Sequence, residues 1–453
     1  MNRVSLPELQ GESTMAPMEK TFVALVGMGT VGTGVARLLL DHGDRTARHA
    51  GRTLWVQHIV VKDPTKLRDA DIPAGLISTD LARLLQDTEV KVVAHLLGGL
   101  EPARTIMLQL LESGKDVVTA NKALLAEHGP ELFDRARQLG RTIAFEASVA
   151  GGIPIIANIS QCLAANQILS LQGILNGTSN FIITNMQEQG IRYEDALLEA
   201  QRLGYAESDP TFDVDGSDAA QKLAILAHLA FGARVHWRQI PRRGIDHIQS
   251  NDLRYASDMG FGLKLLAMAR MHAAGLELHV SPTLVPKGTP LAEVRSNFNA
   301  INVVGDAVGP VFFHGQGAGQ MPTASAVVAD MIDVAVGRAA ITFGNLKLWS
   351  KQPPRVDLRD HAHTKSKYYF RFDVADQPGV LAQIAGILGR HQISIASVHQ
   401  YDRDKDLTTE TVPLVIVTHS ALEHHTGLAQ REIQNLEVVR TQGERLRILT
   451  TEN

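Results

Sequence analysis

Asp218 and Lys222 lie four residues apart in a segment, residues 217–231, whose apolar spacing predicts a helix. This spacing places both side chains on one helix face, where the carboxylate can hold the ammonium. A lysine can accept the hydroxyl proton as hydride leaves a carbinol carbon, and burial or a neighbouring cation lowers its pKa toward the working range. The pair therefore indicates alcohol–carbonyl redox chemistry, although the spacing alone favours an ordinary surface ion pair.

A glycine-rich loop follows the first apolar run of strand length, residues 21–26. Gly27 permits a tight turn, Gly29 lets the backbone approach a pyrophosphate, and Gly32 lets the next helix pack on the strand. The N-terminus of that helix attracts phosphates. We therefore predict a dinucleotide site; the alternative is a glycine-rich turn without a ligand.

Lys62 and Asp63 follow the second predicted strand, where the ribose 2′ position is read. An acidic residue there would accept a hydrogen bond from the 2′-hydroxyl of NAD, whereas Lys62 would attract the 2′-phosphate of NADP. The pair is ambiguous, so we expect NADP with NAD also accepted. The alternative is a solvated pair at a strand end.

Apolar runs of strand length alternate with helical patterns over residues 20–150. This alternation predicts a parallel sheet with helices, a Rossmann-type α/β domain that binds NAD(P). The expected strands cover residues 21–26, 54–61, 90–97, 116–119 and 142–145, with a loop inserted at 41–52 and a helix at 322–340 that returns to this domain.

The pattern changes after about residue 150 to α+β, with helices up to about 240 and longer strands in 260–314. Residues 341–365 are polar and are interpreted as a linker. Residues 366–449 have β-α-β-β-α-β spacing and predict a separate ferredoxin-like unit. Residues 1–19 are interpreted as a mobile N-terminal tail.

Composition excludes several functional classes. The formal net charge is −4, without the basic surplus of a nucleic-acid binder, and apolar runs are too short for a membrane span. The single cysteine, Cys162, excludes a CxxC zinc site and suits a reducing cytoplasm. Its helical surroundings predict a core position, and we interpret His361 and His363 as part of a solvated loop.

Six ordered motifs resemble monofunctional homoserine dehydrogenases with a C-terminal ACT domain, over residues 20–449. The family interconverts L-homoserine and L-aspartate 4-semialdehyde with NAD(P) in threonine, methionine and isoleucine biosynthesis. The resemblance implies a substrate-binding and dimerisation domain at 151–321. The motifs lie at residues 27–32, 119–122, 146–154, 173–181, 204–222 and 315–324.

The resemblance implies roles at matching positions. Lys222 resembles the family's acid/base, and Lys122 the second lysine near the reacting oxygen and nicotinamide. Two facing ammonium groups would lower each other's pKa. Oppositely charged carboxylates would bind the substrate's α-ammonium. The implied substrate-binding residues are Glu207, Asp218, Asp213 and Thr178, with Asn176 as a further hydrogen-bonding candidate.

Cofactor and cation positions are also implied by the resemblance. Gly98 and Gly99, which follow the predicted strand at 90–97, depart from the family pattern, because a small hydroxylated residue is commoner at this position. Hard cations take oxygen ligands, and the resemblance implies a monovalent cation, sodium, that pins the turn between domains. The cofactor positions are Gly27, Gly29, Thr30, Val31, Gly32, Lys62, Gly98, Gly99, Lys122, Gly204 and Gly319. The cation ligands are the Glu146 side chain and the carbonyls of Val149, Gly151 and Ile153.

The segment from Asp376 to Ile384 resembles the opening of an ACT domain. It implies feedback control by L-threonine, the alternative being a structural oligomerisation module. We expect a homodimer or homotetramer with its interface on the strands of 260–314, because their apolar faces need covering. The alternatives to this enzyme are a non-catalytic amino-acid sensor and an oxidoreductase acting on another amino-acid alcohol.

Overall fold

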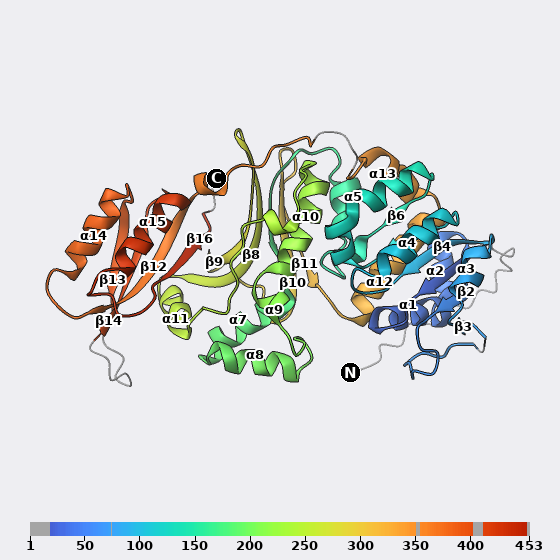
Figure 1. Ribbon diagram of the computed structural model, residues 1–453, viewed down its shortest axis with the longest axis horizontal. Helices are drawn as coiled ribbons and strands as arrows, with labels where there is room; N and C mark the ends of the chain where they lie inside the picture. Colours follow the sequence, from blue (N-terminus) through green and yellow to red (C-terminus); the bar gives the residue numbers. More distant parts are fainter. Residues whose placement is uncertain (1–18, 74, 350–353, 402–410, 451–453) are drawn as a thin grey trace.

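The computed structural model describes residues 19–73, 75–349, 354–401 and 411–450. The chain forms an elongated molecule with three parts in a row (Figure 1). A helix-covered parallel sheet lies at one end, a mixed sheet lies in the centre, and the ACT-like unit lies at the other end. Within the described residues, no helix has the length and apolar character needed to cross a membrane. The predicted tail lies almost wholly outside the described residues.

The N-terminal part confirms the predicted Rossmann-type sheet. Its six parallel strands have the order β3-β2-β1-β4-β5-β6. The central strands are apolar because helices cover both faces. The strands are β1 (Lys20–Val26), β2 (Thr53–Val60), β3 (Ile77–Ser78), β4 (Val90–His95), β5 (Asp116–Thr119) and β6 (Ile143–Ala144), and the helices are α1 (Thr30–Asp41), α2 (Gly43–Ala50), α3 (Leu81–Gln86), α4 (Ala103–Glu112) and α5 (Lys122–Gln138).

One sequence interpretation in this part is wrong, and one strand was missed. The expected loop at 41–52 contains helix α2, where Ala47 and Ala50 alone are buried among the described side chains, and Gly51 with φ +65° follows its last residue. Two alanines give a weak apolar period, so the sequence pattern did not reveal the helix. The short strand β3 was not predicted.

The returning helix is present as two shorter helices, α12 (Gln320–Ala335) and α13 (Arg338–Leu346). A Cβ at Gly34 of α1 would lie 2.9 Å from Ala324, so only glycine permits this close packing of α1 on α12. Residues 341–346 belong to α13, not to the predicted linker.

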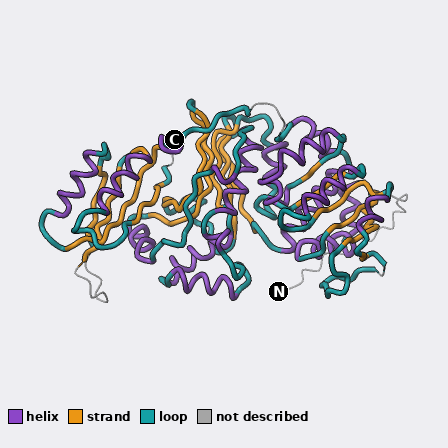
Figure 2. The backbone as a smooth tube through the Cα atoms, viewed as in Figure 1, coloured by secondary structure: helices purple, strands orange, loops and turns teal. Residues whose placement is uncertain are grey.

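The central and C-terminal parts share one mixed sheet of ten strands, visible as continuous orange in Figure 2. Its order is β11-β10-β7-β8-β9-β16-β12-β14-β13, with β15 paired to β12. The strands are β7 (Ile168–Ile174), β8 (Phe261–His272), β9 (Gly275–Pro286), β10 (Phe298–Gly305), β11 (Gly309–Gln316), β12 (Lys365–Ala375), β13 (Ile395–Gln400), β14 (Thr411–Thr418), β15 (Ala421–Leu422) and β16 (Glu444–Ile448).

The predicted ferredoxin-like order of residues 366–449 is confirmed, but the unit is not separate. Strand β16 pairs in parallel with β9 at Thr283 and Leu284. Leu446 and Ile448 of β16 are buried in the same apolar cluster as the central part. A buried ion pair between Arg371 and Asp252, with nitrogen and oxygen 2.7 Å apart, crosses the same junction.

The remaining helices surround this sheet. The longest of them, α10, lies between the sheet and the Rossmann-type part (Figure 1). They are α6 (Ile155–Ala157), α7 (Gly177–Gln189), α8 (Tyr193–Arg202), α9 (Thr211–Val214), α10 (Ser217–Phe231), α11 (Ser250–Asp258), α14 (Val380–Arg390) and α15 (Glu423–Gln434), with short η turns at Glu146–Ser148, Asn158–Cys162, Trp237–Gln239 and His361–His363.

Candidate active site

Asp218 and Lys222 lie in the first turns of α10, on one face as predicted. The Lys222 Nζ donates to Asp218 Oδ2 over 2.8 Å. Their exposed fractions are 3% and 8%, so the interpretation as a surface ion pair is wrong. The helix is buried on every side, because alanines and leucines fill the rest of its surface.

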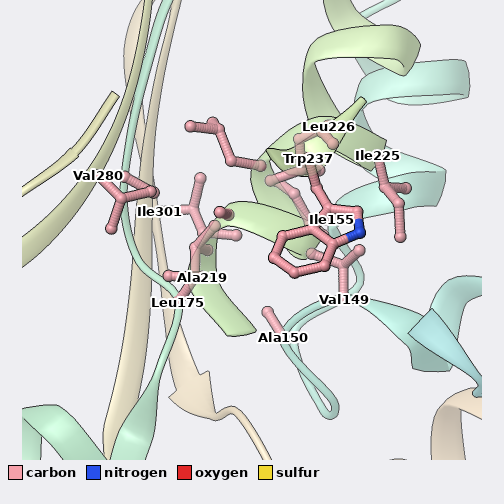
Figure 3. Close-up of a cluster of buried hydrophobic side chains, with 14 of the residues drawn as sticks. Val149, Ala150, Ile155, Leu175, Ala219, Ile225, Leu226, Trp237, Val280 and Ile301 are labelled. Carbon is pink, nitrogen blue, oxygen red and sulfur yellow. The ribbon is translucent and has the colours of Figure 1, made fainter. Parts of the chain in front are cut away.

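Helix α10 rests on an apolar cluster that fixes its position. Figure 3 shows Ala219 of α10 beside Leu175 and Ile301 of the sheet, with Trp237 and Ile155 on the other side. These side chains are nearly all fully buried. Tight packing on both sides gives Asp218 and Lys222 little freedom to move.

Lys122 reaches the same carboxylate from the Rossmann-type part. Its Nζ lies 2.5 Å from Asp218 Oδ1, so one carboxylate holds two amines from segments about a hundred residues apart. Asn121 caps α5 by accepting from Leu124 N over 2.9 Å. The Asn121 amide also donates to the Leu97 and Gly99 carbonyls over 2.9 and 2.7 Å. Sequence reasoning missed this positioning role of Asn121.

A second layer of amides holds the pair from the sheet side. Asn176 donates to Asp213 Oδ1 over 2.7 Å and to Asp218 Oδ2 over 2.8 Å. The Leu175 carbonyl accepts from Lys222 Nζ over 2.6 Å and from Asn299 Nδ2 over 3.1 Å. Asn299 and this carbonyl carried no signal in the sequence, since a backbone acceptor has no side-chain signature.

The two lysines differ in their electrostatics. Burial lowers the pKa of Lys222, and Lys122 lowers it further, although Asp218 opposes both effects. The Asp218 charge raises the pKa of Lys122, so the expected lowering by a facing ammonium group is found at Lys222 but not at Lys122. Burial alone would raise the pKa of Asp218, but the two ammonium groups bring it below its usual range. Burial raises the pKa of Asp213.

A cleft of about 590 Å³ opens beside these groups and brings together all the predicted substrate residues. Thr178, in the first turn of α7, donates its hydroxyl to the Tyr205 carbonyl over 2.7 Å. Glu207 is exposed at the rim, close enough to raise the pKa of Lys122. The predicted residues that line the cleft are Lys122, Asn176, Thr178, Gly204, Glu207, Asp213, Asp218, Lys222 and Gly319.

The glycine loop has the backbone that a pyrophosphate requires. Gly27 has φ +96°, and a Cβ at Gly32 would lie 2.4 Å from the Gly27 carbonyl oxygen. A Cβ at Gly29 would meet no protein atom within 4 Å, which leaves open space above the loop. Thr30 and Val31 begin α1, whose first turn has no acidic side chain and no side-chain cap. This end of α1 therefore fits phosphates.

The end of β2 carries an arginine that sequence reasoning missed. Asp63 Oδ1 accepts from Thr65 N and Oγ1 over 2.8 and 2.7 Å, so this carboxylate closes its own turn. The Arg68 guanidinium donates to the Asp63 carbonyl over 2.7 Å and to the Met28 carbonyl over 3.3 Å. It therefore lies beside the glycine loop, while Lys62 is exposed nearby. Gly98 and Gly99 are exposed at the end of β4.

The predicted cation ligands form a turn between the domains. Glu146 accepts from Ile156 N and Ala157 N over 2.8 and 2.7 Å, so its carboxylate caps α6. Burial raises the pKa of Glu146 to about 7. The Ile153 carbonyl accepts from Ile155 N over 2.8 Å. The described residues contain no cluster of three or more His, Cys, Asp and Glu side chains suited to a metal ion.

The same turn packs closely on the glycine segment before α12. A Cβ at Gly151, which has φ +47°, would lie 2.6 Å from the Gly317 carbonyl oxygen. The Gly152 N–H donates to the Gln316 carbonyl over 3.0 Å. The turn that contains the carbonyls of Val149 and Gly151 is therefore fixed between α6 and the segment before α12.

Two other expectations are wrong. Cys162 is exposed, not part of the core, because it ends a short wide helical turn at the surface. His361 is half-buried against His279 of β9 and does not belong to a solvated loop, whereas His363 is exposed.

Three family models match the chain in order. The model described as "Homoserine dehydrogenase, NAD binding domain" matches residues 27–146, and "Homoserine dehydrogenase" matches 154–332. The ACT domain model matches residues 368–438.

Curated relatives and solved structures agree with these models. A homoserine dehydrogenase of Pseudomonas aeruginosa is 42% identical, covering 95% of this chain and 99% of that protein. One from Bacillus subtilis is 37% identical, with 93% and 96% covered. The crystal structure of a homoserine dehydrogenase from Thiobacillus denitrificans has a TM-score of 0.88 at 40% identity, with 96% and 99% covered. A hyperthermophilic archaeal homoserine dehydrogenase in complex with NADPH has a TM-score of 0.59 at 26% identity, with 72% and 100% covered. The chain therefore belongs to the homoserine dehydrogenase family of oxidoreductases.

Proposed function

We propose that Lys222 is the acid/base in the reversible interconversion of L-homoserine and L-aspartate 4-semialdehyde. The observation that carries the proposal is a buried amine whose pKa is lowered by burial, at the wall of the substrate cleft. In the oxidation, neutral Lys222 accepts the hydroxyl proton while the carbon–oxygen bond becomes a carbonyl. In the reduction, protonated Lys222 returns that proton to the forming alkoxide. A bound nicotinamide supplies the hydride acceptor or donor.

Lys122 has a different role in this proposal. It stays protonated, because the Asp218 charge raises its pKa, and its side chain is 39% exposed toward the cleft. A permanent ammonium stabilises negative charge that develops on the reacting oxygen. Glu207, Asp213 and Asp218 supply carboxylates for the substrate's α-ammonium, and Thr178 supplies a hydroxyl oxygen.

We further propose that the enzyme prefers NADP and also accepts NAD. Lys62 follows β2, and the guanidinium of the newly identified Arg68 bonds to the neighbouring Asp63 carbonyl, where a 2′-phosphate would be read. The Asp63 carboxylate already accepts a hydrogen bond from Thr65, so it is less available to accept one from a ribose hydroxyl. The phosphates would lie on Gly27, Gly29 and the start of α1, and Gly98, Gly99, Gly204 and Gly319 would contact the rest of the cofactor.

A sodium ion at Glu146 remains part of the proposal. The raised pKa of this carboxyl reflects a buried charge without a cation, and sodium beside it would favour the ionised form. The carbonyls of Val149, Gly151 and Ile153 would complete the oxygen ligands. We expect the ion to stabilise the turn between the domains.

Regulation and assembly complete the proposal. Gly379 has φ +93° and begins α14 of the ACT domain, an exposed loop-to-helix junction that suits an amino-acid effector such as L-threonine. We expect a cytoplasmic homodimer or homotetramer whose interface includes the strands of 260–314. Kinetics with and without L-threonine, together with sedimentation, test both expectations.

The activity itself is tested by assaying L-homoserine oxidation with NADP⁺ and with NAD⁺ under the same conditions. We expect turnover with both cofactors and a lower KM for NADP⁺. L-Serine and L-threonine as substrates would detect an oxidoreductase of another amino-acid alcohol. Absence of turnover with every alcohol would favour the non-catalytic sensor.

A further inference from the structure

A second cavity, of about 270 Å³, lies where the ACT domain meets the central sheet. Its walls come from the segment before α11, from β9, from the turn at 361–363 and from β12, α15 and β16 of the ACT domain. It does not share a lining residue with the active-site cleft. The charged groups that line it are Arg242, Arg243, Arg445, Arg447 and Glu423.

The lining of this cavity includes four arginines and one carboxylate, Glu423. Glu423 is fully engaged, because it pairs with Arg445 over 2.7 Å, pairs with Arg447 and accepts from the Tyr368 hydroxyl over 2.8 Å. Two carboxylates outside the lining also pair with these arginines: Glu444 with Arg243 over 2.9 Å, and Glu277 with Arg447 over 4.0 Å. The lining therefore has an excess of positive charge and donor groups, which suits an anion.

Arg242 has no ion pair among the described residues. Its guanidinium lies 5.2 Å from the centre of the Trp237 ring, and the residue is exposed. A cation–π contact satisfies the charge but leaves its N–H donors available.

His361 adds a buried donor. Its Nε2 lies 3.2 Å from Arg447 Nη2, and because a guanidinium only donates, this nitrogen must accept. The neutral ring then carries its proton on Nδ1, which is buried and has no partner among the described residues. One residue that lines the cavity therefore has a buried donor without a partner.

The same cavity wall packs directly on the start of helix α10. Arg242 and Arg243 belong to a segment that bonds to β9, with Arg243 N donating to the Val280 carbonyl over 2.9 Å. A Cβ on the next residue, Gly244, would lie 2.2 Å from the Val214 carbonyl oxygen, which also accepts from Ile245 N over 2.8 Å. Val214 directly follows Asp213 of the active site.

We propose that this junction cavity is a regulatory site for a small anion, a carboxylate or phosphate group, held by Arg242, Arg447 and His361. The ligand would draw Arg242 toward the ACT domain. Because the segment 241–245 lies against residues 214–216, such a shift changes the position of Asp213 and of the α10 N-terminus. Anion binding therefore alters homoserine turnover.

The test titrates the full-length enzyme with sodium phosphate, sodium acetate and L-threonine by isothermal calorimetry, in a zwitterionic buffer with the sodium concentration held constant. Arg242→Gln is compared with Arg238→Gln as a matched control. Arg238 lies 4.8 Å from the same Trp237 ring, but it pairs with Glu127 and does not line the cavity. Homoserine kinetics are then measured with each variant at zero and saturating anion.

We expect phosphate or acetate to bind the parent and Arg238→Gln equally. Arg242→Gln should bind at least about tenfold more weakly, because it loses a charge-assisted hydrogen bond. The anion should change KM or kcat of the parent at least about twofold and leave Arg242→Gln unaffected. If L-threonine binding also weakens in Arg242→Gln, its carboxylate is the natural anion; if only phosphate binding weakens, a phosphorylated metabolite is.

Two results would overturn the proposal. One is that none of the three probes binds, or that all bind Arg242→Gln as tightly as the parent. The other is binding without any change in kinetics, which removes the regulatory role. The kinetic arm rests on the proposed activity but calorimetry does not, so failure of the enzyme assay and failure of the anion site are distinguishable.

Discussion

Replacing Lys222 by methionine separates the chemical role of the amine from its structural role. The variant keeps the length of the side chain and removes a buried charge. Its neighbours stay satisfied: Asp218 keeps Lys122 at 2.5 Å and Asn176 at 2.8 Å, and the Leu175 carbonyl keeps Asn299 at 3.1 Å. Since no charge is left unpaired, the folding free energy should change by less than about 2 kcal/mol.

Turnover should respond much more strongly. Loss of a positioned acid/base lowers kcat about 10²–10⁴-fold, which is roughly 3–5 kcal/mol of barrier at about 1.4 kcal/mol per factor of ten. The pH dependence of the rate should have opposite directions in the two reactions. Oxidation needs neutral Lys222, so the parent rate rises with pH through a pKa below the usual lysine value of 10.5, and reduction falls through the same pKa. In Lys222→Met, this pH dependence should disappear from the rates of both oxidation and reduction.

The assay is steady-state homoserine oxidation and semialdehyde reduction between about pH 6 and 10, with thermal unfolding of each variant. Gln221→Met is the matched control, because Gln221 is buried in the same helix, 4% exposed, and does not line the cleft. A Lys222→Met enzyme with kcat within about threefold of the parent would refute the acid/base role. An equal loss in Gln221→Met would attribute the effect to packing of α10.

Three further predictions concern the cofactor loop, the domain junction and the cation turn. Gly29→Ala should raise the KM for the cofactor without lowering the midpoint of thermal unfolding. Gly32→Ala should lower both the cofactor affinity and this midpoint, because its Cβ would lie 2.4 Å from the Gly27 carbonyl oxygen. Cofactor titration and thermal unfolding of the two variants test this difference. Asp252→Ala should cost roughly 3–5 kcal/mol in urea unfolding by leaving Arg371 buried and incompletely paired, and the double variant with Arg371→Met should recover much of it. The pKa of Glu146 rises from 4.5 to about 7 on folding, so its stabilising contribution is present below about pH 4.5 and is lost as pH rises through about 7. Glu146→Gln should flatten this part of the stability curve in sodium-free buffer, and an unchanged slope would contradict the assignment.

Much of the fold was predictable because apolar runs and turn residues determine it locally. β1 and β4 are mostly apolar, rich in valine and alanine, and only a sheet covered on both faces can bury such runs. The pairing of β16 with β9 was not predictable, since two strands about 160 residues apart meet through backbone hydrogen bonds that any sequence can make.

The candidate site was predictable only in part, for a related reason. A four-residue spacing places Asp218 and Lys222 on one face whatever the fold. The approach of Lys122 to the same carboxylate depends on how two domains pack, and family resemblance rather than local pattern indicated it. The amides of Asn121 and Asn299 act on backbone carbonyls, which leave no trace in spacing or composition.

The strand pairing between the central sheet and the ACT domain has a consequence for shortened forms of the chain. Strand β9 is twelve residues long and largely buried, and β16 protects part of its outer side. In a protein truncated before residue 365, this edge of β9 would be exposed to solvent, and a strand of another copy could pair with it. Removing the ACT domain would then promote self-association of the chain, which light scattering of a truncated enzyme would reveal.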